Sequence, residues 1–142
     1  MRKIIFLPKK EAERIIPCSY ECIISMRDPG EKVNLHSSWD KCLTIECDDL
    51  DPDELKAIGR SDLAASAQLF TSDHAREILD FVLSLQSKTD TLYVHCKAGV
   101  SRSAAVAIFL GTYFDVPVFK RGQKFDINEN AHIKNVLKEA FG

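Results

Sequence analysis

The stretch TLYVHCKAGVSRSAAVAIFL, residues 91–110, decides how this chain folds. Its first five residues are β-branched, aromatic or otherwise suited to a sheet interior, so they predict a buried strand at 91–95. Residues 102–114 are apolar on nearly every side, which predicts a buried helix and not a surface helix. The turn between them contains Gly99. A strand, a tight loop and a helix are therefore expected in direct succession.

The rest of the chain alternates in the same way. Further strands are predicted at residues 3–7, 20–26 and 42–47. Helices are predicted at residues 9–15, from about Pro52 within an acidic segment, from an N-cap at Ser72, and from about Asn130. Strands separated by helices predict an α/β fold in which one domain spans residues 1–142. Its central, mostly parallel sheet of about four to five strands is expected to be flanked by helices.

Composition limits the possible partners. The chain has 142 residues, of which 45% are hydrophobic and 28% charged, and this is ordinary for a globular domain. A formal net charge of −2 gives no general attraction to nucleic acid or to an anionic membrane. No apolar run is long enough to span a bilayer or to serve as a signal peptide. We therefore expect a cytoplasmic protein, in the simplest case a monomer, without nucleic-acid or membrane partners.

The five cysteines are odd in number and follow no disulfide spacing. A zinc site built from Cys18, Cys22, Cys42 and Cys47 would have poor ligand spacing, so no metal is predicted. Oxidation could join Cys47 to Cys96, since a reactive thiol would then have a partner.

The segment HCKAGVSRS, residues 95–103, carries the chemistry. Ligands of parallel α/β sheets bind at the carboxyl ends of the strands, which is where this loop lies. Its backbone N–H groups and the first turn of the following helix can form a nest for a tetrahedral anion, and Gly99 lets the backbone curl with positive φ. The predicted anion-binding residues are Lys97, Ala98, Gly99, Val100, Ser101 and Arg102.

Four side chains of this segment have individual predicted roles. The same donors that bind an anion favour the thiolate of Cys96, which can attack phosphorus without a separate base. Arg102 offers a planar fork for two phosphate oxygens. Ser103 can donate a hydrogen bond to the sulfur as it leaves. His95, behind the loop, is expected to hold the loop conformation.

The pattern HCxxGxSRS resembles the signature of the cysteine-based protein tyrosine phosphatase superfamily, and most closely its dual-specificity branch. The resemblance covers residues 42–114. It implies a dual-specificity phosphatase-like fold and hydrolysis of phosphoesters through a phosphocysteine intermediate on Cys96. It also implies that no metal or other cofactor takes part, and that the substrate is a protein or peptide phosphorylated on tyrosine, or on serine and threonine as well.

In that family one aspartate protonates the leaving group and later activates water. The segment LTIECDDLD, residues 43–51, resembles the family's acid loop, and Asp49 falls best at the family's position. Asp48 and Asp62 remain alternatives, Asp62 because its distance along the chain from the nucleophile is closer to the customary one. With Asp49 as the acid, residues 50–70 would be an insertion or an extended loop.

Other interpretations stay open at this point. Asn130 resembles an asparagine that supports the active-site loop in many family members, but it also fits a plain helix N-cap. A module that binds phosphopeptides without hydrolysing them would normally lack the cysteine or the arginine, and both are present here. A rhodanese-like sulfurtransferase also uses a loop cysteine at a strand–helix junction, but GVSRS after the cysteine fits it poorly.

Overall fold

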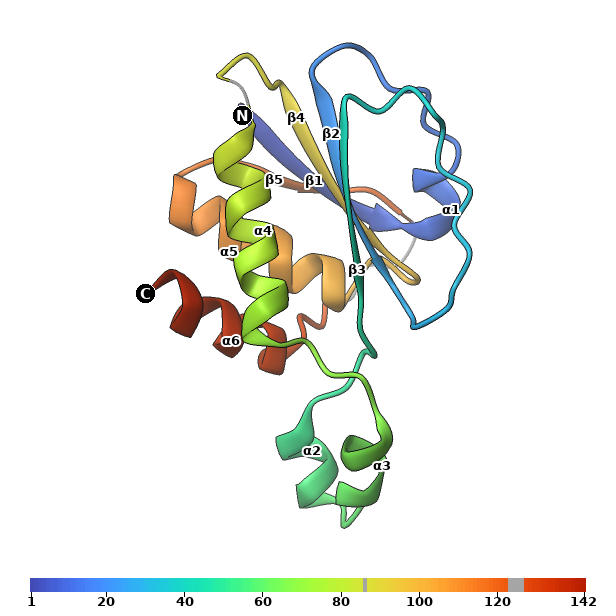
Figure 1. Cartoon of the computed structure of the whole chain (residues 1–142), viewed down its shortest axis with the longest axis vertical. Coiled ribbons are helices and arrows are strands. Elements are labelled where there is room, and N and C mark those ends of the chain that lie inside the picture. Colours follow the sequence, from blue (N-terminus) through green and yellow to red (C-terminus); the bar gives the residue numbers. More distant parts are fainter. Residues whose placement is uncertain (86, 123–126) are drawn as a thin grey trace.

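The computed structural model describes residues 1–85, 87–122 and 127–142. Within them, parallel strands form a five-stranded sheet in the order β3-β2-β4-β1-β5 (Figure 1). The strands are β1 (Lys3–Pro8), β2 (Glu21–Arg27), β3 (Lys41–Glu46), β4 (Thr91–Cys96) and β5 (Val118–Lys120). The predicted α/β class with a largely parallel sheet is confirmed.

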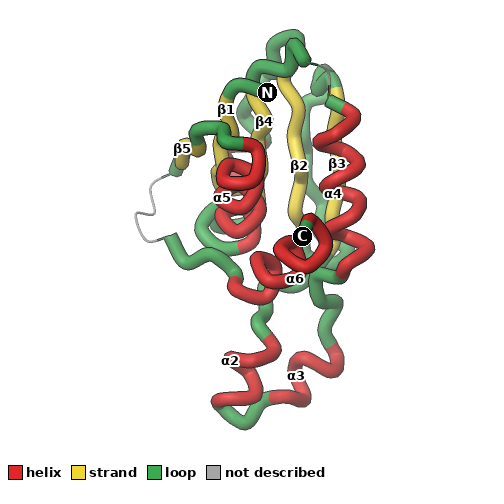
Figure 2. The backbone as a smooth tube through the Cα atoms, turned by 90° about the vertical axis from the view of Figure 1, so that its left-hand side faces the viewer, coloured by secondary structure: helices red, strands yellow, loops and turns green. Residues whose placement is uncertain are grey.

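Helices cover the two faces of the sheet unequally (Figures 1 and 2). Three long helices pack on one face: α4 (Ser72–Ser84), α5 (Arg102–Phe114) and α6 (Ala131–Phe141). The other face is covered by the short helix α1 (Lys9–Ala12) and by side chains of the segment that leads to β3. Two further short helices, α2 (Pro52–Ala57) and α3 (Ser61–Ser66), stand off from the sheet.

The central strand β4 is buried along its whole length, as the residue types of 91–95 predict. Leu92 and Val94 point into the larger core beneath α4, α5 and α6, whereas Tyr93 points into the smaller core on the α1 side. This alternation follows from the two-residue period of a strand. Helix α5 occupies the predicted range 102–114 and is buried on several sides.

Some local predictions were wrong. Helix α4 is capped by Thr71 and not by Ser72: the Thr71 hydroxyl accepts the His74 N–H at 3.4 Å, and His74 Nδ1 accepts the Thr71 N–H at 3.0 Å. A histidine thus takes the place that glutamate or glutamine holds in the usual capping box, which hides the motif from a search by residue type. Helix α1 is shorter than predicted, and α3 and β5 were not predicted.

The parallel arrangement brings several strand ends together. β1, β2, β3 and β4 all end at the same edge of the sheet, so the loops that follow β2, β3 and β4 meet there. No helix in the described ranges is both long and apolar enough to cross a membrane.

Candidate active site

The loop 97–101 joins the carboxyl end of β4 to α5, as the sequence predicts. Gly99 has a φ of +71°, in the left-handed region. A Cβ atom there would lie 2.4 Å from the backbone nitrogen of Pro8 and 2.6 Å from the carbonyl carbon of Leu7. Both the backbone conformation and the close approach to β1 therefore require glycine at this position.

Three carbonyl groups of this loop accept hydrogen bonds from the surrounding structure. The donor–acceptor pairs are Lys9 N–H to Lys97 C=O (3.3 Å), Asn128 N–H to Val100 C=O (2.9 Å) and Asn130 N–H to Ser101 C=O (3.2 Å). In a trans peptide the next N–H points opposite to the C=O, so these contacts turn the N–H groups of Ala98, Ser101 and Arg102 away from the outer partners. Among the described residues, the N–H groups of 98–101 find no acceptor.

Helix α5 begins without a side-chain cap. Ser101 is its N-cap residue, but its hydroxyl makes no bond to the helix backbone and instead donates to Asp49 Oδ1 at 2.7 Å. The N–H groups of the first turn thus have no side-chain acceptor from the cap, and the positive end of the helix dipole lies at the same place. Loop and helix start together form a nest of donors that suits a tetrahedral anion. We call this nest, with Cys96 and Arg102, the cradle.

Cys96 is the last residue of β4 and is 2% exposed. Its Sγ lies 3.1 Å from Ser103 Oγ. A thiolate has no proton to donate, so with Cys96 ionised the Ser103 hydroxyl is the donor. This contact can stabilise negative charge on the sulfur.

His95 holds the loop through a defined tautomer. Its Nδ1 lies 3.3 Å from the carbonyl oxygen of Cys96, which can only accept, so Nδ1 carries the proton. Its Nε2 then accepts from Ser25 Oγ at 2.6 Å, and Ser25 Oγ accepts from Arg27 Nε at 2.8 Å. Burial lowers the pKa of His95 to about 4, so the ring is neutral near pH 7.

Arg102 is 3% exposed, and one edge of its guanidinium is fixed. Nη1 donates to the carbonyl oxygen of Cys47 at 2.7 Å and pairs with Asp28 Oδ1 at 2.8 Å. Nε is buried and has no partner among the described residues. Burial opposes the charge of Arg102, but negative neighbours, first Cys96 and then Asp28 and Asp49, raise its pKa above the usual value. The Arg102 guanidinium therefore stays charged, and its Nε–H has no acceptor among the described residues.

Asp28 was missed as a site residue, because Asp28-Pro29-Gly30 was interpreted only as a turn. Its Oδ2 also lies 3.8 Å from the ammonium of Lys97. Its position follows from the sheet: it is the first residue after β2, and β2 lies next to β4. Glu31 secures the turn by accepting the Asp28 N–H at 2.9 Å and pairing with Lys9 at 3.1 Å. The carboxyl-end rule, applied to each strand, would have pointed to Asp28.

The three candidate acids lie in different surroundings. Asp49 is exposed, and its Oδ1 accepts from Ser101 of the cradle at 2.7 Å and from Asn130 Nδ2 at 3.0 Å. Asp48 instead closes the base of the α2–α3 segment, where its Oδ2 accepts the Gln68 N–H at 2.8 Å. Asp62 lies in α3 and accepts from Arg60 Nε at 3.2 Å. Of the three, Asp49 is the one bonded to the cradle.

Asn130 fits both interpretations given to it. Its Oδ1 caps α6 by accepting the Ile133 N–H at 3.0 Å. Its Nδ2 donates to Asp49 Oδ1 at 3.0 Å and to the Leu50 carbonyl at 3.1 Å, and its own N–H donates to Ser101. One residue thus joins α6, the acidic segment and the cradle.

Cys47 is a poor partner for Cys96 in a disulfide. Its N–H donates to Arg27 C=O at 2.9 Å, so it continues the β2–β3 pairing, and β2 lies between β3 and β4. Two strand spacings are about 9.5 Å. A disulfide needs Cα atoms within about 7 Å, so the backbone would have to move. Burial also raises the pKa of the Cys47 thiol to about 12.

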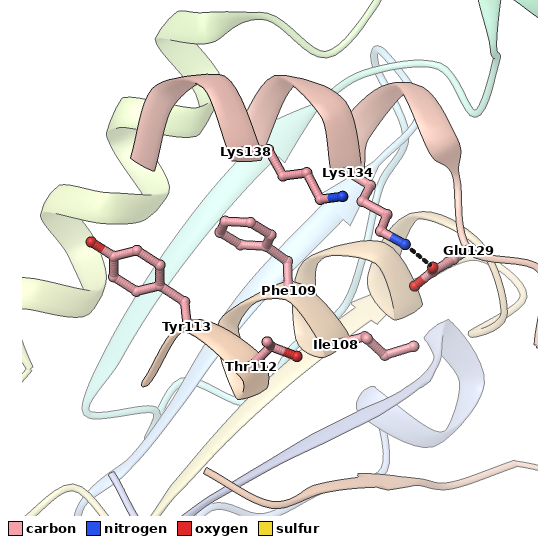
Figure 3. A pocket seen from close by; sticks show the side chains of 7 residues that line it. All are labelled: Ile108, Phe109, Thr112, Tyr113, Glu129, Lys134 and Lys138. Atoms are coloured by element: carbon pink, nitrogen blue, oxygen red, sulfur yellow. Dashed lines mark hydrogen bonds and ion pairs between the residues drawn. The ribbon is translucent and has the colours of Figure 1, made fainter. Parts of the chain in front are cut away.

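A hollow of about 330 Å³ lies away from the cradle, between α5 and α6 (Figure 3). Phe109 and Tyr113 line it from α5, and Lys134 and Lys138 reach over it from α6. Lys134 is paired with Glu129 at 2.9 Å. The hollow includes none of residues 95–103, so it is separate from the candidate active site. Within the described ranges, no group of three or more His, Cys, Asp or Glu side chains could hold a metal ion.

Comparison with known proteins adds no relative: no family model, no curated protein and no solved structure matches the chain.

The neutral His95 predicts how stability depends on pH. Between pH 6.5 and about 4 the unfolded chain binds a proton on this ring that the folded chain does not. The free energy of unfolding should therefore fall as the pH falls through this window, by up to about 1.4 kcal/mol per pH unit from this group. Urea unfolding from pH 7 to pH 4.5 should show a steeper loss for the wild type than for His95→Asn. Parallel curves for the two proteins would contradict the burial of a neutral ring.

Proposed function

We propose that the protein hydrolyses phosphoesters with Cys96 as the nucleophile, through a phosphocysteine intermediate and without a metal. One observation carries the proposal: the loop and the helix start that follow a buried cysteine, at the carboxyl edge of a parallel sheet, hold donors without an acceptor. They are the N–H groups of residues 98–101 and the Nε of Arg102. A buried charged donor without an acceptor is costly, and a tetrahedral oxyanion would satisfy several of these groups at once.

In the first step the Cys96 thiolate attacks phosphorus. The S–P bond forms while the bond from phosphorus to the ester oxygen breaks, and the electron pair of the broken bond stays on that oxygen. The protonated carboxyl of Asp49 gives its proton to the departing oxygen. Arg102 and the loop N–H groups bind the equatorial oxygens, whose charge they stabilise in the transition state.

In the second step water attacks the phosphocysteine, and the Asp49 carboxylate takes a proton from that water. The S–P bond breaks, its electron pair returns to the sulfur, and inorganic phosphate leaves. The Ser103 hydroxyl, 3.1 Å from Sγ, stabilises the departing thiolate. Asp28 supports both steps because it holds the Nη1 edge of Arg102 at 2.8 Å, which leaves Nε for the phosphate.

The proposed substrates are proteins or peptides phosphorylated on tyrosine, with phosphoserine and phosphothreonine as further substrates. The resemblance of HCKAGVSRS to the dual-specificity branch favours this class. The proposal places the enzyme in the cytoplasm, since a reducing compartment keeps a thiolate nucleophile reduced, and takes the monomer as the simplest state. The five cysteines are all free thiols.

Replacement of the nucleophile tests the reaction itself. The wild type should hydrolyse p-nitrophenyl phosphate equally well with and without a chelator, and Cys96→Ser should abolish the turnover, because a serine hydroxyl is far less nucleophilic there than a thiolate. The measurement is steady-state release of p-nitrophenol. Tight phosphopeptide binding by the wild type without any turnover would instead indicate a binding module, and thiosulfate-dependent activity would indicate a sulfurtransferase.

Asp49 and Asp62 make a matched pair for the general acid. Asp49→Asn should lower kcat for a substrate with a poor leaving group, such as an alkyl phosphate, by about 10²–10⁴-fold. Asp62→Asn should leave kcat unchanged, since Asp62 lies in α3 and pairs with Arg60 just before that helix, not with the cradle. The assignment is wrong if the Asp62 variant collapses while the Asp49 variant keeps its rate.

A further inference from the structure

The segment from Asp48 to Phe70, which we call the arm, projects from the body next to the candidate active site (Figures 1 and 2). It contains α2 and α3, which pack against each other. The two ends of the arm are tied together where Asp48 N–H donates to Gln68 C=O at 2.7 Å. Helices α2 and α3 contribute no residue to either core of the sheet, whereas Phe70, at the end of the arm, belongs to the larger core.

The arm carries an apolar hollow that the fold leaves open. Its volume is about 410 Å³, and the aliphatic side chains that line it belong to Leu50, Leu55, Ala57 and Ile58. Ile58 is 70% exposed. The hollow and the exposed Ile58 side chain together give the arm an apolar surface beside its carboxylates.

The apolar hollow adjoins the cradle at Asp49, which lines the hollow and accepts a hydrogen bond from Ser101 at 2.7 Å. A second, smaller hollow of about 130 Å³ lies on the outer, carbonyl side of the cradle loop, and it is lined by Ser101, by residues 128–131 with Glu129 among them, and by three carboxylates of the arm. The same three carboxylates, Asp49, Asp51 and Glu54, also line the apolar hollow. A ligand whose phosphate lay in the cradle could therefore extend past Asp49 onto the arm.

The cradle and the two hollows differ in the sign of their charged side chains. The cradle presents Arg102 and Lys97, whereas the charged residues that line the two hollows are all acidic within the described ranges, Glu129 included. A ligand that fits both parts bears a phosphate, with a cationic group and an apolar group beside it. Inositol phosphates, nucleotides and phospholipids bring further negative charge next to the phosphate, which these carboxylates would repel.

We infer that the arm docks the polypeptide of a phosphorylated protein substrate: a lysine or arginine near the phosphorylated residue lies against Asp51 and Glu54, and an apolar side chain packs on Leu55 and Ile58. The inference rests on the proposed function, which assigns the phosphate of the substrate to the cradle. It adds which residues flank the phosphorylated residue. Alternating polar and apolar side chains on an extended chain are what a polypeptide supplies and a small phosphoester lacks.

Binding to Cys96→Ser tests the inference apart from turnover. Calorimetric titration would compare three phosphotyrosine nonapeptides. The first has lysines on both sides of the phosphotyrosine and a leucine at each end. In the second, glutamates replace the lysines, and in the third, serines replace the leucines. The lysine–leucine peptide should bind about three- to tenfold more tightly than either other peptide. The advantage over the glutamate peptide should shrink as salt is raised from 0.05 to 0.5 M.

Variants of the arm should change this preference in a defined way. Glu54→Lys in the Cys96→Ser background should reduce the ratio of affinities for the lysine and glutamate peptides, or reverse it, and Glu54→Gln should reduce it partly. Ile58→Ser should remove the advantage of leucine over serine. Glu77→Lys is the matched control, because Glu77 is an exposed glutamate on α4 outside both hollows, and it should change neither ratio.

The outcomes separate the docking inference from the proposed function. Equal affinity for the three peptides, or equal changes in Glu54→Lys and Glu77→Lys, would overturn the docking inference even if p-nitrophenyl phosphate is hydrolysed. Tighter binding of an inositol phosphate than of the lysine–leucine peptide would overturn it as well. A preserved peptide preference in a protein that hydrolyses no phosphoester would support docking while the proposed hydrolysis fails.

Discussion

The site depends on the direction of a few peptide groups. Donors from the start of α1 and from the segment before α6 bind carbonyl oxygens of the loop after β4, and His95 binds the carbonyl oxygen of Cys96 at the end of β4. Because each peptide is planar and trans, binding these carbonyls turns the N–H groups that follow them away from the outer partners. The loop can curl in this way because Gly99 adopts a positive φ where a Cβ atom would meet the backbone of β1. The arrangement thus concentrates positive potential around Cys96 before any ligand arrives, which is the kind of preorganisation that electrostatic catalysis requires.

The arginine completes this arrangement through groups from two other strands. Arg102 is buried, and its charge is held by Asp28 after β2 and by the Cys47 carbonyl after β3. Asn130 joins the same region to α6 and to the acidic segment through four hydrogen bonds. The strand order β3-β2-β4 makes this convergence possible, since it places three successive carboxyl ends side by side. A substitution that shifts any of these segments should therefore alter the geometry of the cradle.

Sequence patterns predicted the parts of this structure that local chemistry decides. Strand β4, helix α5 and the loop between them follow from an apolar run, a glycine and a buried helical stretch, and each lies where it was predicted. Asp28 could not be found in the same way, because its partner Arg102 lies 74 residues away and the contact exists only through the pairing of β2 with β4. Strand β5 is three residues long and lies at the sheet edge, where a strand has little pattern of its own. In the arm the helix predicted from about Pro52 is confirmed as α2, whereas the second helix, α3, has no buried residue to reveal it.

The central claim is that the cradle around Cys96 binds a tetrahedral oxyanion through Arg102 and the loop N–H groups. Calorimetric titration with tungstate, at fixed pH and ionic strength, tests it without requiring catalysis. The wild type should bind one tungstate per chain, and Arg102→Ala should weaken that binding by at least about tenfold while circular dichroism shows that it remains folded. Equal affinity in the two folded proteins, or no binding by the wild type, would contradict the account.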